Sequence, residues 1–366
     1  MNSVCGIRST GRIVTDLADR LMAEGHECRI AYGREKVPQK YQEITYRIGT
    51  QYDVYMAGLK TRILDNEGFN SRRATKKFLK WASAYNPDIL WLHNLHGYYV
   101  NIDLLFDWIK SRPDMEVRWT LHDCWTFTGH CSDFGFVGCN KWETGCTHCC
   151  QKNIYPASFG LDRCVSNYNK KMKIFTGVKN MKLITPSQWL AGLVKRSFLK
   201  EYEVTVINNT IDTTVFCPTA SNFREKYNLT EKKILLGVAT AWGPRKGLND
   251  FQKLAEMLDE SWAVVLVGLK EKQIRKMPKN ILCIARTNSR VELAQIYTAA
   301  DVFVNLTCED NYPTVNLEAQ ACGTPCVTYR TGGSAESVPA ENVVEQHDLQ
   351  AVIEIINRLT ANEPKE

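Results

Sequence analysis

The chain lacks an apolar run long enough to cross a membrane. Its longest such run, residues 262–269, is far shorter than the ~20 residues that a membrane-spanning helix needs. The N-terminus also lacks the order of charged, apolar and small residues that marks a secretory signal. We therefore expect a cytoplasmic protein whose thiols are kept reduced.

Strong charge imbalance, internal repeats and low-complexity tracts are also missing. The formal net charge is +6 over 366 residues, which is too small to imply a nucleic-acid partner. With 44% hydrophobic and 23% charged residues, the composition is that of a globular protein. The length favours two domains, because single hydrophobic cores stop growing near ~250–300 residues.

Cysteine, by contrast, is plentiful and unevenly distributed. Six of the 14 cysteines fall within residues 124–150, where a disulfide framework is not expected in a reducing compartment. Cys146 and Cys149 have the spacing of half a tetrahedral zinc site. Cys131 and Cys139 are the two further thiolates that would complete it, which predicts a structural zinc ion.

This zinc site would organise an insertion at about residues 124–150. Four thiolates leave no open coordination position, so the metal would take no part in catalysis. Two alternatives stay open at this point. The cysteines are ordinary buried or free thiols, or His130 or His148 replaces one of the four ligands.

The N-terminal half begins with a loop rich in glycine and serine at residues 2–11. A helix follows, with one apolar face formed by Ile13, Val14, Leu17, Ala18 and Leu21. Gly25 ends it, and residues 26–32 are predicted to form a strand. This order is typical of a Rossmann-like unit, although the strand that should precede the loop is absent. Further strands are predicted at residues 88–93, 117–122 and 182–185.

The C-terminal half alternates between strands and helices. Buried strands are predicted at residues 234–239, 263–268, 281–285, 302–306 and 326–329, with helices at 248–258, 290–299 and 313–322. Such alternation predicts an α/β domain with a doubly wound parallel sheet and helices on both faces. We place the domain boundary near residue 205, which gives domains of residues 1–204 and 205–366.

The most informative motif is the acidic segment at residues 309–325. Pro313 suits the first turn of a helix, and Gly323 suits the residue that ends it. The free N–H groups of that helix suit a phosphate, and Glu318 is placed to accept hydrogen bonds from ribose hydroxyls. The donor-binding residues predicted at this motif are Asn311, Tyr312, Pro313, Thr314, Val315 and Glu318.

Two further loops follow predicted strands of the same sheet. In the first, Arg245 and Lys246 are placed to neutralise a diphosphate leaving group. In the second, Gly332 and Gly333 would let the backbone approach a ligand closely.

Taken together, these blocks resemble the retaining glycosyltransferases of family 4, which have the GT-B fold. More narrowly they are similar to the transferases of colanic-acid and capsule biosynthesis, which share runs like residues 120–125 and 127–131. The resemblance implies two Rossmann-like domains facing across a cleft, with the acceptor on the N-terminal side and the donor on the C-terminal side.

The resemblance also implies roles for individual residues. Glu318 matches the acid that holds the donor ribose, and Asp310 matches an acid, usually glutamate, near the donor sugar. Lys246 matches the phosphate-binding lysine. The arginine that the family often places five residues earlier is replaced by Ala241, so Arg245 is assigned to that task.

In the N-terminal domain, the resemblance assigns Gly6 and Gly11 to donor binding and His122 to the donor sugar. His122 either orients the substrate or acts as a general base, since its ordinary pKa is close to neutrality. Family chemistry retains the anomeric configuration and requires no metal or other cofactor for catalysis.

The implied function is transfer of a hexose-type sugar from a nucleotide-diphosphate sugar to a glycan or lipid-linked acceptor during surface-polysaccharide assembly. Two other functions are kept as alternatives. The first is a nucleotide-sugar epimerase of the same fold, which needs no acceptor. The second is a catalytically degenerate protein that binds sugar as a partner of another enzyme.

The acceptor side is predicted at the loop after the strand at residues 88–93. His93, His96 and Tyr98 are the candidates there, although Tyr98 and Tyr99 would also suit a hydrophobic core. Residues 163–200 contain nine lysines and arginines and no acid, with aromatic residues between them. That composition predicts either peripheral contact with anionic lipid at the inner face of the cell membrane or a solvated helix face.

Overall fold

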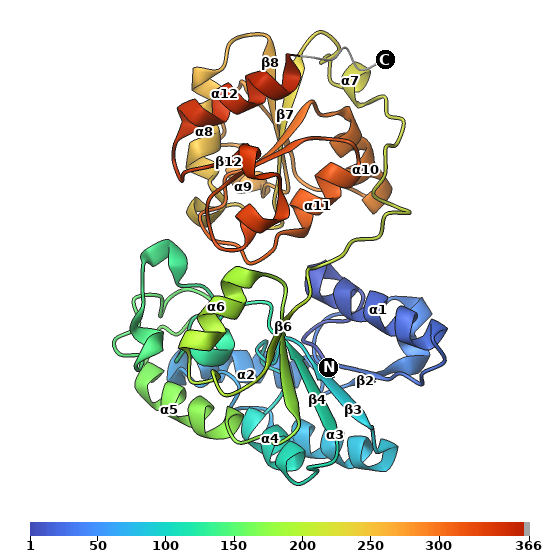
Figure 1. The fold of residues 1–366 in the computed structure, drawn as a ribbon, viewed down its shortest axis with the longest axis vertical. Helices are drawn as coiled ribbons and strands as arrows, with labels where there is room; N and C mark the ends of the chain where they lie inside the picture. The colour runs from blue at the N-terminus through green and yellow to red at the C-terminus, as the bar shows by residue number, and fades with distance from the viewer. Residues whose placement is uncertain (362–366) are drawn as a thin grey trace. The chain divides into compact units, whose positions relative to one another are not determined.

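The computed structural model of the protein describes residues 1–361. Contacts within the chain divide it into two compact units, one of residues Met1–Asn208 and one that begins at Asn209. Each unit contains a parallel sheet with helices packed on it (Figure 1). The division falls slightly later than residue 205, because strand β6 (Val204–Val206) pairs with β5 (Met181–Thr185) and belongs to the first unit.

The main sheet of the first unit contains four parallel strands in the order β3-β4-β5-β6. Strands β3 (Ile89–Leu92) and β4 (Glu116–Thr120), like β5, confirm the predicted positions. A separate parallel pair is formed by β1 (Ile30–Tyr32) and β2 (Thr45–Arg47). The helices are α1 (Arg8–Ala23), α2 (Gln51–Leu64), α3 (Arg72–Tyr85), α4 (Ile102–Lys110), α5 (Cys164–Phe175) and α6 (Gln188–Arg196).

Two sequence predictions for the start of the chain need correction. The strand predicted at residues 26–32 is confined to Ile30–Tyr32, because β2 offers it only three paired positions. The first two residues lie where a strand that precedes the loop was expected. Asn2 bridges Tyr32, the N–H of His93 donates to the carbonyl of Met1 at 2.9 Å, and these contacts place residues 1–2 between β1 and β3.

Below these residues a groove of about 590 Å³ lies between β1 and β3. It is lined mainly by apolar side chains of α1, α3 and the two strands, including Leu17, Ala82 and Leu90. The packing of this part of the unit is therefore looser than the close packing that is general for protein interiors.

We expect Ala82→Leu to stabilise the first unit. Ala82 lies on α3, is 4% exposed and faces this groove. The added carbons would bury apolar surface without a clash and contribute about 1–2 kcal/mol. Thermal unfolding should show a raised Tm. The control is Ala294→Leu, because Ala294 is fully buried in closely packed α10 and overpacking there should lower the Tm. An unchanged or lowered Tm for Ala82→Leu would contradict the prediction.

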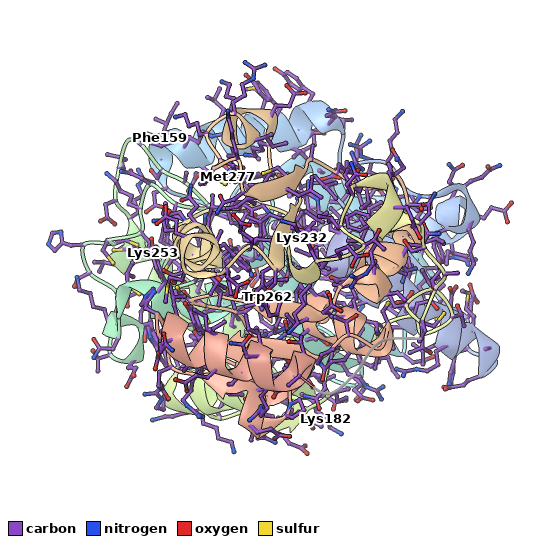
Figure 2. The ribbon with its side chains drawn as sticks, turned by 90° about the horizontal axis from the view of Figure 1, so that it is seen from above. Phe159, Lys182, Lys232, Lys253, Trp262 and Met277 are labelled. Atoms are coloured by element: carbon purple, nitrogen blue, oxygen red, sulfur yellow. The ribbon has the colours of Figure 1, made fainter. Side chains whose placement is uncertain are left out.

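The second unit is a six-stranded parallel sheet in the order β12-β11-β10-β7-β8-β9. The strands are β7 (Lys233–Val238), β8 (Trp262–Val267), β9 (Ile281–Ile284), β10 (Val302–Asn305), β11 (Cys326–Tyr329) and β12 (Val343–Val344). Every residue of β8 is buried, as expected for a central strand covered on both faces. In Figure 2, Trp262 at the start of β8 lies inside the unit, and Lys253 marks the helix α8.

Separate hydrophobic cores cover the two faces of this sheet. One core contains residues of α8 (Leu248–Met257) and α12 (Leu349–Thr360), and the other contains residues of α10 (Arg290–Ala299) and α11 (Thr314–Ala321). The short helices α7 (Phe223–Lys226) and α9 (Glu271–Ile274) complete the unit. The predicted doubly wound architecture is confirmed. Among residues 1–361, no helix is both long and apolar enough to span a membrane.

Candidate active site

Three loops of the second unit meet where β7, β10 and β11 end. The N–H of Cys308 donates to the carbonyl of Arg245 at 2.8 Å, which joins the loop after β10 to the loop after β7. Thr331 Oγ1 donates to the carbonyl of Cys308 at 2.7 Å, which joins the loop after β11 to the same point. Carboxyl ends of parallel strands are where doubly wound sheets bind ligands, so the predicted donor loops form one site.

Two glycines allow these loops to approach so closely. Gly247 has φ +71°, and a Cβ there would lie 2.1 Å from the carbonyl oxygen of Leu306. Gly332 has φ +50°, and its Cβ would lie 2.0 Å from the carbonyl oxygen of Asp310. No other residue type fits either position without moving the backbone. Gly332, expected to admit a ligand, is thus already needed for contact between the loops.

The predicted cations lie against the predicted acid. Lys246 Nζ contacts the carboxylate of Asp310, and Arg245 Nη1 donates to the carbonyl of Glu309 at 2.8 Å. Burial alone would raise the pKa of Asp310, but the charge of Lys246, with smaller contributions from Arg245 and the N–H of Asn311, lowers it overall. Asp310 is therefore ionised at neutral pH, and it holds Lys246 in place when no phosphate is bound.

Glu318 lies on α11, one and a half turns from the start of the helix. It is 8% exposed, and Tyr297 Oη donates to its Oε2 at 3.1 Å. Pro313 precedes the first residue of the helix, one position before the first turn in which the sequence placed it. The N–H groups of Thr314 and Val315, in the first turn, have no carbonyl partner within the helix. The N–H of Asn316 donates to the carbonyl of Pro313 at 3.2 Å. Tyr297 was not predicted, because only the fold brings α10 beside α11.

A buried polar network fixes the orientation of α11. This network was not predicted from the sequence. Asn316 is fully buried; its Oδ1 accepts from Asn305 Nδ2 at 2.8 Å and its Nδ2 donates to Ser337 Oγ at 2.8 Å. Thr328 and Ser334 share a hydroxyl hydrogen bond of 2.7 Å beside it. An asparagine on the inner side of a short helix was the available signal.

The remaining predicted donor residues are divided between the units. Asn311 is buried, and the carbonyl of Tyr312 accepts from Asn209 Nδ2 at 2.9 Å. Gly6 and Gly11 lie in the first unit, where the N–H of Gly6 donates to the carbonyl of Gly11 at 2.9 Å at the start of α1. Their contact with the donor stays a prediction.

In the first unit, two predicted histidines lie in direct contact. His93 Nδ1 and His122 Nε2 are 3.0 Å apart and share one proton in a hydrogen bond. Burial lowers the pKa of His122 to about 4, and burial together with His122 lowers the pKa of His93 well below its ordinary value. Both rings are neutral at pH 7, so His122 is a hydrogen-bonding group with weak basicity.

His96 forms a second cluster with residues that were not predicted. Its Nε2 lies 2.7 Å from Asp123 Oδ2, and its Nδ1 lies 2.8 Å from Tyr155 Oη. Burial alone would lower the pKa of His96, but the charge and hydrogen bond of Asp123 raise it overall. The pKa of Asp123 is lowered, because His96 and the N–H of Trp125 outweigh its burial. His96 and Asp123 therefore form a partly buried ion pair.

The loop that carries these candidates is held by one buried acid. Glu67 Oε1 accepts from the N–H groups of Gly97 at 2.7 Å and Tyr98 at 2.9 Å. Tyr98 is half-buried and its ring contacts Tyr155, with ring centroids 6.0 Å apart. Tyr99 is 1% exposed and belongs to the hydrophobic core, which was the alternative to an acceptor-side role for the tyrosine pair. His93, His96 and Tyr98 remain the acceptor-side candidates.

The cysteine-rich insertion brings its thiols to one small cavity. Cys131, Cys139, Cys146 and Cys149 line a space of about 20 Å³, and the N–H of Gly129 donates to Cys146 Sγ at 3.1 Å. Within residues 1–361, however, no three histidine, cysteine, aspartate or glutamate side chains already form a metal-binding arrangement. The zinc site therefore stays a prediction.

The basic segment at residues 163–200 exposes all of its lysines and arginines except Lys171. Lys171 is 1% exposed and donates to the carbonyls of Trp125 at 2.7 Å and Thr128 at 3.1 Å. Phe175 is fully buried in the core. Trp189 and Phe198 are partly buried against the core of the first unit. Contact of this segment with lipid stays a prediction.

Comparison with known proteins defines the class and then the family. HepE of Anabaena, solved in complex with UDP and glucose, is similar over 99% of this chain and 89% of that chain, at 14% identity and a TM-score of 0.64. Two Rossmann-like units of this kind define the GT-B fold class. The model for Glycosyltransferase Family 4 matches residues 10–215, and that for group 1 glycosyl transferases matches residues 220–366. The chain belongs to the family 4 glycosyltransferases.

Two relatives are similar in sequence. WcaC of Escherichia coli (strain K12), named as a colanic acid biosynthesis glycosyl transferase, is 25% identical over 93% of this chain and 85% of that protein. The N,N'-diacetylbacillosaminyl-diphospho-undecaprenol alpha-1,3-N-acetylgalactosaminyltransferase of Campylobacter jejuni is 28% identical over 32% of this chain and 31% of that protein.

We expect the His96–Asp123 pair to stabilise the first unit only within a pH window. Because folding raises the pKa of His96, its contribution is complete below the ordinary value of 6.5 and is lost as pH rises through the raised value. Because folding lowers the pKa of Asp123, its contribution is lost below the ordinary value of 3.8. Asp123→Asn should therefore lower the free energy of unfolding by about 2 kcal/mol at pH 5–6 and by less at pH 9.

The free energy of unfolding of the wild type and the variant, measured at several pH values, checks this prediction. Asp114→Asn is the control, because Asp114 is an exposed residue of the same unit and its loss should change stability equally at every pH. A difference between wild type and Asp123→Asn that stays constant from pH 5 to pH 9 would contradict the assignment.

For the thiols, we expect about one zinc per chain in protein purified without chelating resin. Cys146→Ser should lose the metal, whereas Cys217→Ser should keep it, because Cys217 lies in the second unit. Elemental analysis of folded protein measures both. Zinc-free wild-type protein that unfolds cooperatively would exclude the site.

Proposed function

We propose that the protein transfers a hexose-type sugar, with retention of configuration, from a nucleotide-diphosphate sugar to a glycan or lipid-linked acceptor. The reaction would take place in the cytoplasm, at the inner face of the cell membrane, during assembly of a surface polysaccharide. The observation that carries the proposal is the convergence of Lys246, Arg245, Asp310 and Glu318 on one edge of the second sheet.

Each of these groups has a specific task in donor binding. Glu318 accepts hydrogen bonds from the ribose hydroxyls, and Tyr297 holds the carboxylate in position. The diphosphate takes the place of Asp310 as the partner of Lys246, while Arg245 lies beside it. The first turn of α11 supplies N–H groups to the same phosphates. Because these groups are held by the protein before the donor arrives, little reorganisation is needed when negative charge develops on the leaving group.

The anomeric configuration of the sugar is retained if the acceptor hydroxyl attacks the anomeric carbon on the same face from which the diphosphate departs. The leaving phosphate then takes the acceptor proton, and Lys246 and Arg245 stabilise the charge that remains. His122, neutral and hydrogen-bonded to His93, orients the donor sugar and is not required as a base. Asp310, ionised at neutral pH, accepts hydrogen bonds from the sugar. No step requires a metal.

The comparisons support the proposed substrates by analogy. WcaC is named for colanic acid biosynthesis, HepE was solved with UDP and glucose, and the Campylobacter enzyme is named for an undecaprenol-diphosphate acceptor. The last of these is the basis for a lipid-linked acceptor here.

We expect Glu318→Ala to abolish stabilisation by the donor. Wild-type protein should be stabilised by one nucleotide family, by about 2.7 kcal/mol at ~100 times the dissociation constant. A thermal-shift screen with uridine, guanosine and adenosine diphosphates and their sugars measures this. Glu256→Ala is the control, because Glu256 is an exposed acid on α8. The thermal shift that the donor produces in this variant should equal that in the wild type.

The outcomes separate the candidate functions. A shift that is lost only in Glu318→Ala supports the donor site, and product formed only in the presence of an acceptor supports transfer. Turnover of the donor without an acceptor would indicate the epimerase instead. Absence of any shift with every nucleotide sugar would leave the degenerate, sugar-binding function as the better account.

A further inference from the structure

Helix α2 exposes an apolar face. Its residues Tyr52, Tyr55, Leu59 and Ile63 are 70%, 63%, 38% and 54% exposed. With 3.6 residues per turn, these positions follow one another along a single side of the helix. The opposite side, which contains Ala57 and Thr61, is buried against the unit. Large apolar side chains in a row on the solvent side are unusual for a helix that packs only on its own domain.

A second segment extends this apolar surface. Phe159 is 68% exposed and Leu161 is 47% exposed. The N–H of Phe159 donates to the carbonyl of Arg62 at 2.8 Å, and that of Leu161 donates to the carbonyl of Ile63 at 3.0 Å, so the segment is joined to the last turn of α2. Phe159 lies at the outside of the molecule in Figure 2. We call Tyr52, Tyr55, Leu59, Ile63, Phe159 and Leu161 the α2 face.

Basic side chains surround the α2 face. Lys60 and Arg62 are exposed on the helix itself. Lys152 donates to the carbonyl of Gly160 at 3.1 Å, which places its ammonium group beside the second segment. Arg163 is also exposed, and its N–H donates to Asp65 at the end of α2.

The acids near the α2 face are engaged by the backbone of the protein. Asp53 forms the capping box at the start of α2, and Asp65 is 1% exposed. Asp162 is exposed, but its two oxygens accept from the N–H groups of Cys149 and Cys164. These hydrogen bonds leave Asp53 and Asp162 ionised, but the four cations of the rim outnumber these two acids, so the net charge of the rim is positive.

We propose that the α2 face docks the first unit onto an anionic lipid bilayer. Tyrosines and aliphatic side chains with a basic rim are suited to the boundary between lipid headgroups and acyl chains. The positive rim is attracted to anionic headgroups. A second copy of the chain would bring the same positive rim to the contact, so a bilayer is the better electrostatic complement.

The α2 face lies close to the acceptor-side cluster of the same unit. Thr61, on the buried side of α2, donates to Glu67 Oε2 at 3.3 Å, and Glu67 holds the loop with His96 and Tyr98. The ring of Tyr98 would lie 3.5 Å from a Cβ at Gly58. Docking therefore brings that loop near the headgroup layer. The use of this position to reach a lipid-linked acceptor rests on the proposed function, whereas the docking itself does not.

Flotation with vesicles tests the docking directly. Wild-type protein should bind vesicles of phosphatidylcholine with 30% phosphatidylglycerol strongly and vesicles of phosphatidylcholine alone at least tenfold more weakly. Each basic residue near the surface contributes about fivefold in affinity. Lys60→Glu with Arg62→Glu should therefore weaken binding to the anionic vesicles at least ~25-fold, and high salt should weaken wild-type binding.

The contribution of the apolar side chains to docking is tested by combining Tyr55→Ser with Leu59→Ser. This double variant should bind the anionic vesicles about tenfold or more weakly than the wild type. Matched controls lie in the second unit. Val291→Ser removes an apolar side chain that is 51% exposed on α10, and Lys253→Glu reverses an exposed charge on α8. Both controls should bind like the wild type. The Tm and the donor-induced thermal shift of every variant establish that it is folded and that the donor site is intact.

Three outcomes would overturn the proposal. The first is equal binding of wild-type protein to neutral and anionic vesicles, or no binding to either at low salt. The second is an equal loss of binding in the control variants. The third is a dimer in sedimentation that Tyr55→Ser with Leu59→Ser dissociates, which would assign the α2 face to a second copy of the chain. A failed donor shift with normal vesicle binding would instead refute only the proposed transfer.

Discussion

The candidate donor site depends on the close approach of backbones at one edge of the second sheet. The loop after β10 lies against the loops after β7 and β11, and glycines at positions 247 and 332 make both contacts sterically allowed. Hydrogen bonds from Cys308 and Thr331 then hold the three loops together. The site is thus built from backbone contacts first, and its charged side chains take their positions from them.

In each unit, one ionised aspartate of the candidate sites is accompanied by a partner of opposite sign. Asp310 stays ionised because Lys246 lies against it, and Asp123 stays ionised because His96 does. The pair of His93 and His122 is the opposite case, since neither ring has an adjacent acid strong enough to outweigh burial and both are neutral. Under the proposed function, the first unit would offer hydrogen bonds to a sugar and the second would offer charge to a diphosphate.

The first unit also combines features that the chain keeps far apart. Helix α2, the segment that follows the cysteine-rich insertion and the loop of His96 meet through Thr61, Glu67 and Tyr155. The exposed side of α2 is apolar and basic, and its buried side supports the acceptor-side loop. One helix therefore connects a surface suited to lipid with the residues suited to an acceptor, which accords with a lipid-linked substrate.

The alternation of strands and helices, the acidic segment before α11 and the basic turn after β7 could all be predicted from the sequence. These are local features, because periodicity, helix ends and the order of strands along a parallel sheet depend on neighbouring residues. Tertiary structure alone decided the partners that lie far apart in the chain, such as Tyr297 for Glu318 and Asp123 for His96. It also decided exposure: Lys171 and Phe175 are buried although their segment is basic, while Tyr52 and Phe159 are exposed although they are apolar. Exposure depends on which helix face meets the sheet, and composition does not contain that information.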